Sequence, residues 1–281
     1  MKRRMRLPLL IASLLLLGAA SSYGQIPNPA DYDPILIPVF FFGSGAHGSQ
    51  WVTSVELNAT HGVVMPIAIL SGSPQCPKPC GCALINRVLG PRPTTVCDQL
   101  LVDYIRGIYL YVPKDVDRAA LHISARVRDL SRQAESVGTE IPVVRPSDLR
   151  DGPIMLLDVP TAGRFRVSLR VYDVAKSRDN VNIRIYDANA LKRGDRTPLV
   201  ETVITMPVLP PLAASDPSFP LQPPSAVVIG DLVGVFPKLA AVNAVSIEVR
   251  GQQTPADPKR YWAFVSITNN VTQEVTVVSP Q

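Results

Sequence analysis

The chain has 281 residues, 46 % of them apolar and 18 % charged, and its 17 glycines and 28 prolines follow no fixed period. This composition excludes a collagen-like or low-complexity chain and suits one large or two ordinary globular domains. The formal charge of +5 arises near the N-terminus, because without Lys2, Arg3, Arg4 and Arg6 there are 24 basic and 23 acidic side chains, so nucleic acid is not an expected partner.

The first 24 residues have the three parts of a secretory signal peptide. MKRRMR is cationic, LPLLIASLLLLGAA is apolar, and the small residues Ser22 and Gly24 suit cleavage after Gly24. An uncleaved membrane anchor is the alternative, but the apolar stretch is shorter than the ~20 residues that a span needs. We therefore expect removal of residues 1–24, a lead at 25–33, and a mature chain without a membrane span, secreted to the periplasm or beyond the cell.

β-Strands separated by turns are expected after this lead. ILIPVFFFG, WVTSVELNAT, VVMPIAIL and RGIYLYVP are rich in β-branched and aromatic residues and are bounded by glycine or proline. These segments predict a first β-sandwich domain at residues 34–115, interrupted by a loop at 71–97.

The predicted loop contains all four cysteines: Cys76, Cys80, Cys82 and Cys97. In an oxidising compartment an even number of cysteines favours disulfides, here two, with three pairings open. Cys80 with Cys82 is the least favoured pair because alternate residues of an extended chain lie near the 7 Å limit for bridging. A zinc site is less favoured, since only half of its usual spacing pattern is present, and a redox site would favour C-x-x-C.

Three later segments alternate between apolar and polar residues with a period of two: LHISARVRDL, RFRVSLRVYD and NIRIYD. This period is typical of half-buried antiparallel strands. We expect a second sandwich domain at 116–281, containing a proline-rich loop or linker at 208–225. The best helical candidate is the short RPSDLRD. The predicted fold class is all-β: two immunoglobulin-like or jelly-roll-like sandwiches, predominantly antiparallel, with little helix.

The polar sides of these three strands predict a possible ligand face. If the strands are neighbours in one sheet, arginines and tyrosines gather on one side of it, suited to anionic glycans through bidentate pairing and stacking. An ordinary solvated face, whose arginines pair with acidic side chains, is the plainer alternative. The residues of this predicted face are Arg126, Arg128, Arg164, Arg166, Arg170, Tyr172, Arg184 and Tyr186.

No catalytic motif is found. His47 lies in GSGAHGSQW between Ser44 and Ser49, but the G-x-S-x-G elbow of a serine hydrolase and the G-K-[ST] ending of a phosphate-binding loop are absent from the sequence. A glycine-rich turn is the favoured interpretation. The sequence therefore predicts no catalytic residue, no metal ligands and no cofactor.

The segments YWAFVSITNNVTQEVTVVSPQ, GSQWVTSVELN and SLRVYD resemble those of a set of exported bacterial β-sandwich proteins without an assigned activity. The resemblance implies export and a sandwich fold and carries over no functional residue.

These features together favour a non-catalytic structural or binding protein, with an anionic polysaccharide or another surface protein as partner. The alternatives are a secreted hydrolase or carbohydrate-active enzyme with an unrecognised site, and an adhesin or assembly subunit that pairs strands with a partner. The oligomeric state is left open.

Overall fold

A computed structural model describes residues 31–60, 63–68, 83–96, 103–104, 107–132, 137–173, 180–207, 224–252 and 260–280. The protein is all-β, as predicted, and every described strand pair is antiparallel. The signal-peptide prediction, the lead up to residue 30, the four cysteines and residues 208–223 of the proline-rich segment lie outside the described residues.

The N-terminal strands form one six-stranded sheet and two ribbons. The sheet has the order β10-β9-β3-β2-β7, with β6 also paired to β3, while β1 pairs β8 and β4 pairs β5. The bounds are β1 Tyr32–Ile37, β2 Phe40–Ser44, β3 Gln50–Ala59, β4 Val63–Ala68, β5 Ala83–Leu89, β6 Thr94–Val96, β7 Asp103–Tyr104, β8 Ile108–Pro113, β9 Leu121–Asp129 and β10 Thr139–Ile141.

Strands β3 and β9 form the centre of this sheet. Their alternating sequences bury every second side chain, and the register sets Val55 beside Ala125 and Leu57 beside Ile123 on the buried side. The apolar side chains of β3 and β9 therefore stack in rows, which is the arrangement that a period of two produces in antiparallel strands.

The C-terminal strands form two four-stranded sheets, β11-β16-β13-β14 and β15-β12-β17-β18. The bounds are β11 Ile154–Pro160, β12 Phe165–Asp173, β13 Asn180–Asp187, β14 Val200–Thr205, β15 Ser225–Ile229, β16 Ala244–Gly251, β17 Tyr261–Asn269 and β18 Val275–Val278. The described helical elements are short: α2 (Ala188–Lys192), α3 (Leu232–Val235), η2 (Ala46–Gly48), η3 (Pro146–Asp148) and η4 (Pro237–Ala241). Only η3 forms within the RPSDLRD segment.

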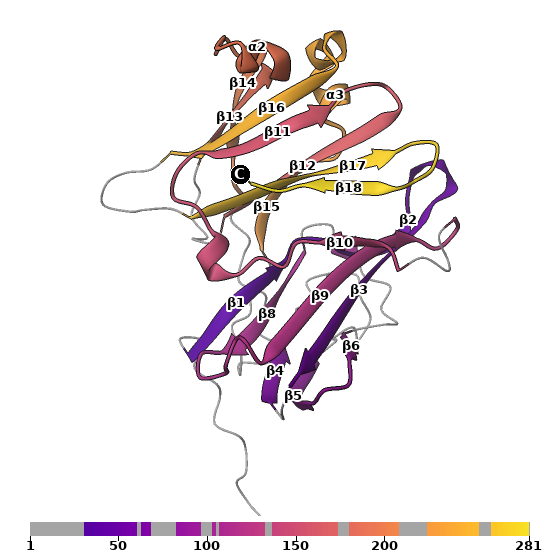
Figure 1. The fold of residues 1–281 in the computed structure, drawn as a ribbon, viewed down its shortest axis with the longest axis vertical. Helices are drawn as coiled ribbons and strands as arrows, with labels where there is room; N and C mark the ends of the chain where they lie inside the picture. Colours follow the sequence, from indigo (N-terminus) through magenta and orange to yellow (C-terminus); the bar gives the residue numbers. More distant parts are fainter. Residues whose placement is uncertain are drawn as a thin grey trace, which may run out of the picture.

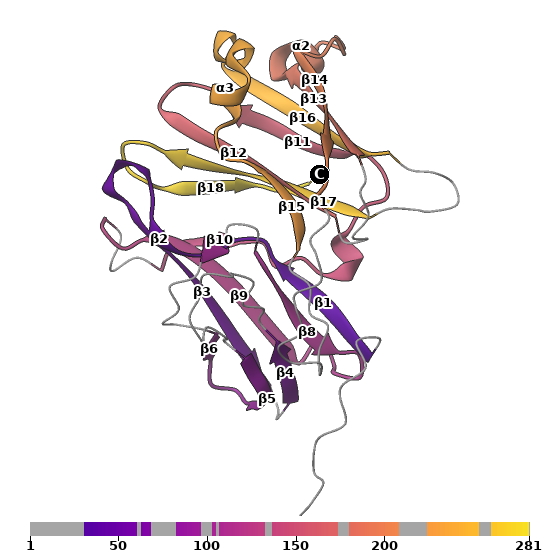
Figure 2. The ribbon, with the colours of Figure 1, turned by 180° about the vertical axis from the view of Figure 1, so that it is seen from behind.

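The two C-terminal sheets pack face to face around an apolar core. Leu169 of β12, Ile183 of β13 and Val265 of β17 are almost completely buried in it. Figures 1 and 2 show the β11 sheet above the β12 sheet, so these strands form a β-sandwich.

The β12 sheet is covered on its second side as well. Tyr172, Trp262 and Phe264 point away from the sandwich core and belong to the same apolar cluster as Ile37 of β1 and Leu110 of β8. Both views place this sheet between the β11 sheet and the N-terminal strands. The molecule therefore has a middle sheet, buried on both sides over much of its area.

A domain boundary and a loop expected from the sequence both differ from this arrangement. β9 and β10 were assigned by sequence to the second domain, at 116–281, but they pair with the sheet of β3, so the change of sheet falls between Ile141 and Ile154. The segment 71–97, predicted as a loop, contains β5 and β6, so the prediction of a continuous loop is wrong. The change of sheet and the strands within 71–97 both depend on pairing between segments distant in the sequence, which a local sequence pattern does not reveal.

Candidate functional site

The arginine face predicted from the sequence is divided among three sheets. Arg126 and Arg128 lie on β9, the residues from Arg164 to Tyr172 on or beside β12, and Arg184 and Tyr186 on β13. Because β9, β12 and β13 belong to different sheets, they are not neighbours, and the prediction of a single continuous face is wrong.

On β13, the two residues of the predicted ligand face form hydrogen bonds with acidic side chains. Arg184 Nε donates to Glu201 Oε1 at 2.8 Å, and the Tyr186 hydroxyl donates to Glu248 Oε2 at 2.8 Å. The Arg184 guanidinium holds the pKa of Glu201 below its usual value. This is the ordinary solvated face that the sequence left as the alternative.

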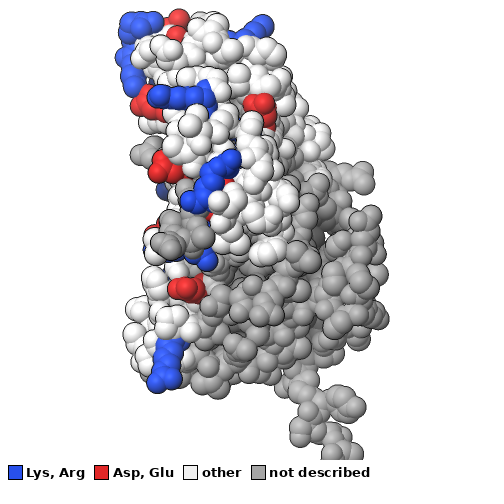
Figure 3. All heavy atoms as spheres, turned by 90° about the vertical axis from the view of Figure 1, so that its right-hand side faces the viewer, with Lys and Arg blue, Asp and Glu red and all other residues white. Residues whose placement is uncertain are grey.

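On β9, Arg126 and half-buried Arg128 project from the polar side, and Arg126 lies 3.8 Å from Glu140 of β10. Arg164 precedes β12 and places its guanidinium 4.8 Å from the ring centre of Phe165. In Figure 3, Lys and Arg side chains are interspersed with Asp and Glu along one margin, and the described part of that side shows no continuous cationic patch.

The polar side of β12 faces inward, toward the N-terminal strands. Arg166, Ser168 and Arg170 line a cavity of about 290 Å³ between the two layers, which we call the inter-layer cavity. Next along the strand, Tyr172 is fully buried and its hydroxyl donates to the carbonyl of Pro38. Burial raises the pKa of Tyr172, so it stays a neutral donor.

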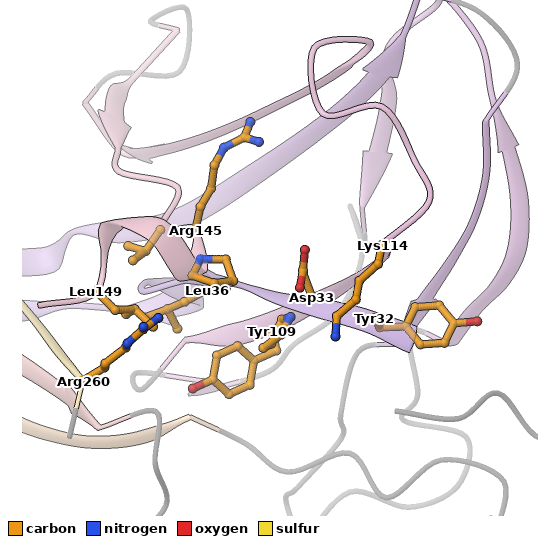
Figure 4. Close-up of a pocket in the computed structure, with 11 residues that line it drawn as sticks. Tyr32, Asp33, Leu36, Tyr109, Lys114, Arg145, Leu149 and Arg260 are labelled. Carbon is orange, nitrogen blue, oxygen red and sulfur yellow. The ribbon is translucent and has the colours of Figure 1, made fainter. Parts of the chain in front are cut away.

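A second cavity, of about 350 Å³, opens beside β1, and we call it the β1 cavity (Figure 4). Its cations are Lys114, Arg145 and Arg260, and its aromatic side chains are Tyr32 and Tyr109. These residues come from four regions of the sequence: Tyr32, Tyr109 with Lys114, Arg145 and Arg260. None of the three cations was singled out by sequence analysis.

Backbone pairing brings these regions together. The amide of Leu36 donates to the carbonyl of Val144 at 2.9 Å and the reverse bond is also 2.9 Å, which fastens one end of the 144–150 segment to β1. At the other end, Arg150 and Tyr261 exchange two backbone bonds of 2.9 and 2.8 Å. These two bridges hold Arg145 and Arg260 beside the same cavity.

The charge of the β1 cavity is unbalanced. Asp33 is the one acidic residue among its described lining residues, and its carboxylate accepts from Arg118 Nη2 at 2.8 Å. Within the described chain, Lys114, Arg145 and Arg260 form no ion pair with an acidic side chain. In Figure 4, Lys114 and Arg260 extend toward Tyr109 from opposite sides, while Arg145 extends away from them.

The two tyrosines that line this cavity are neutral phenols. Tyr109 is 5 % exposed, and its burial, together with nearby Tyr111 and Asp173, raises its pKa. Burial and the neighbouring Asp31 raise the pKa of Tyr32 as well. Both phenols therefore remain protonated in neutral solution.

His47 lies in an exposed turn, η2, with a left-handed backbone conformation at φ 58°. Ser49 Oγ donates to the carbonyl of Ala46 at 2.7 Å, which closes the turn. The glycine-rich turn predicted for GSGAHGSQW is confirmed.

Within the part of the chain that the structure describes, no cluster of three or more His, Cys, Asp or Glu side chains is placed to hold a metal ion. No helix in that part is both long and apolar enough to cross a membrane. No protein-family model, curated protein or solved structure matches this chain.

Proposed function

We propose that the protein is an exported, non-catalytic binding protein whose β1 cavity takes an acidic sugar unit of an anionic glycan. The observation that carries the proposal is the pair of cations Lys114 and Arg260, which extend toward Tyr109 at a cavity whose one described carboxylate, Asp33, is held by Arg118. Guanidinium and ammonium groups without a protein counter-ion favour a carboxylate or sulfate ligand.

The size and the aromatic walls of the β1 cavity suit one sugar residue. At the ~30 Å³ that a water molecule occupies in the liquid, 350 Å³ holds about twelve water-sized groups, close to the size of a uronic acid unit. The ring of Tyr109, between Lys114 and Arg260 in Figure 4, supplies apolar surface for the sugar ring, and its hydroxyl supplies a donor.

The same residues favour binding over glycoside cleavage. Cleavage uses two carboxyl groups flanking the scissile bond, commonly one as acid and the other as base or nucleophile. Asp33 is the one carboxylate among the described lining residues and it is occupied by Arg118. The hydrolase alternative therefore finds no support at this cavity.

The test is calorimetric titration of the mature protein with an oligosaccharide containing glucuronate. We expect saturable binding that weakens as salt is added, because exposed charges are screened over about 8 Å at physiological ionic strength. The double variant Lys114→Ala and Arg260→Ala should bind at least about tenfold more weakly, since a hydrogen bond to a charged group contributes about 1.5–3 kcal/mol.

A matched control is Arg126→Ala with Arg184→Ala, which removes the same charge from β9 and β13, outside the cavity. Its affinity should equal that of the unaltered protein. Equal losses in the two double variants would show that overall charge, and not the β1 cavity, governs binding. Absence of binding by the unaltered protein would refute the proposed ligand class.

A further inference from the structure

The inter-layer cavity has one apolar wall and one polar wall. The apolar wall is formed by Phe41, Trp51, Val127, Ile141, Val228 and Val275. The polar wall consists of Arg166, Ser168 and Arg170 of β12 with Ser266 and Thr268 of β17. No Asp or Glu is among the described residues that line it.

The polar wall follows from the register of the middle sheet. Ser168 is paired with Ser266 and Arg166 with Thr268, so their side chains project together on the side opposite the sandwich core. Further along the same side the register continues into the buried aromatic group of Tyr172, Trp262 and Phe264. This side of the middle sheet is therefore apolar at one end and polar at the other.

The hydroxyl of Ser168 is a further feature of the polar wall. The residue is 9 % exposed, and its hydroxyl has no hydrogen-bond partner in the described structure. A buried hydroxyl without a partner costs about 1–3 kcal/mol, so native proteins rarely retain one without a reason. A ligand atom in the cavity would satisfy it.

The two arginines define the charge of that ligand. Arg170 lies over the ring of Phe264, 5.8 Å from its centre, and burial lowers its pKa, which reflects the cost of holding a cation here. Arg166, half-buried at the same wall, forms no ion pair with a described acidic side chain. An anion beside Arg166 would balance its charge.

We propose that the inter-layer cavity binds a small amphipathic carboxylate, with its head at Arg166 and Ser168 and its apolar chain against Phe41 and Trp51. The volume of about 290 Å³ holds about ten groups at the ~30 Å³ of one water, the number of non-hydrogen atoms in octanoate. Exposed Ser44, Ala46 and Gly230 also line the cavity, so a ligand has a route in from solvent. This site is separate from the β1 cavity and does not depend on the function proposed for it.

The experiment titrates the mature protein with octanoate while recording calorimetry and tryptophan fluorescence. We expect saturable binding, a change in the emission of Trp51, and an increase in the melting temperature with octanoate concentration. Octan-1-ol and octylammonium, which share the chain but lack the anionic head, should bind at least tenfold more weakly.

Two variants with a matched control locate the head group. Arg166→Gln should weaken octanoate binding at least tenfold and leave octan-1-ol binding unchanged, whereas Arg164→Gln, just before β12 and outside the cavity, should change neither. If Arg166→Gln fails to fold, the smaller change Ser168→Ala provides the test, with an expected loss of three- to tenfold.

Three outcomes would overturn the proposal. The first is no saturable binding of octanoate by the folded protein. The second is equal affinity for octanoate and octylammonium, and the third is an equal effect of Arg164→Gln and Arg166→Gln. A glucuronate oligosaccharide should not displace octanoate, so success or failure here is distinguishable from that of the β1 cavity.

Discussion

At the scale of single residues, Asp129 shows how one buried carboxylate organises a turn. One of its oxygens accepts from the amide of Gln50 at 2.7 Å and from the Ser131 hydroxyl at 2.7 Å, and the other accepts from Arg132 at 3.2 Å. Arg132 in turn donates to the carbonyl of His47 at 2.7 Å. The end of β9 is thereby joined to the turn between β2 and β3.

Asp129 should also make stability depend on pH. Burial acts to raise the pKa of this carboxyl, but the hydrogen bonds from Ser131, Gln50 and Arg132 prevail and lower it. Since the folded pKa lies below the ordinary value of 3.8, the carboxylate stabilises the fold above that pH, and the contribution is lost as the pH falls below it.

We therefore predict that Asp129→Asn lowers the free energy of unfolding by about 1–3 kcal/mol at pH 7. Urea unfolding at pH 7 and at pH 3 checks this, and the deficit of the variant should shrink at the lower pH. Asp151→Asn, at an exposed position, is the control. An equal deficit at both pH values would contradict the role of the charge.

At the scale of elements, β12 is the central example. Its odd-numbered residues Val167, Leu169 and Val171 are buried in the sandwich core, as the alternation predicts. Its even-numbered residues point toward the N-terminal strands instead of solvent, with Ser168 and Tyr172 buried and Arg170 half-buried. Arginine and tyrosine tolerate both settings because each combines an apolar body with a polar end.

Truncation of Leu169 should measure the packing of this strand. Leu169 is 1 % exposed, so Leu169→Ala should destabilise the protein by about 2–5 kcal/mol through lost burial and the cavity left behind. Val203→Ala on β14, where the side chain is 52 % exposed, should cost less than about 0.5 kcal/mol. Chemical denaturation distinguishes the two, and similar costs would argue against the described core.

At the scale of the whole molecule, the middle sheet joins the N-terminal and C-terminal strands. Tyr172 donates to the carbonyl of Pro38, and the Thr139 hydroxyl donates to the carbonyl of Val275 at 2.8 Å. The apolar cluster around Ile37 and Leu110 includes Trp262 and Phe264 from the other layer. The two layers share a core, so we expect them to unfold together.

A test of this coupling is Tyr172→Phe, which leaves the ring packing in place and removes the donor to Pro38. The unsatisfied carbonyl should lower the free energy of unfolding by about 1–3 kcal/mol.

Thermal unfolding of the unaltered protein, followed by far-ultraviolet circular dichroism and tryptophan fluorescence, should show one coincident transition. Two separated transitions would show that the layers are independent units.

The sequence by itself determined the class of fold and the extent of several strands. LHISARVRDL, RFRVSLRVYD and NIRIYD became β9, β12 and β13 because a period of two is a local property of an extended chain with one face in a core. Only the tertiary structure decided which strands are neighbours. It placed Arg166 and Arg170 at the wall of the inter-layer cavity. It also brought Lys114, Arg145 and Arg260, from three regions of the sequence, to the β1 cavity. The physical reason is that strand pairing and layer packing depend on contacts between residues distant in the chain, which local periodicity does not encode.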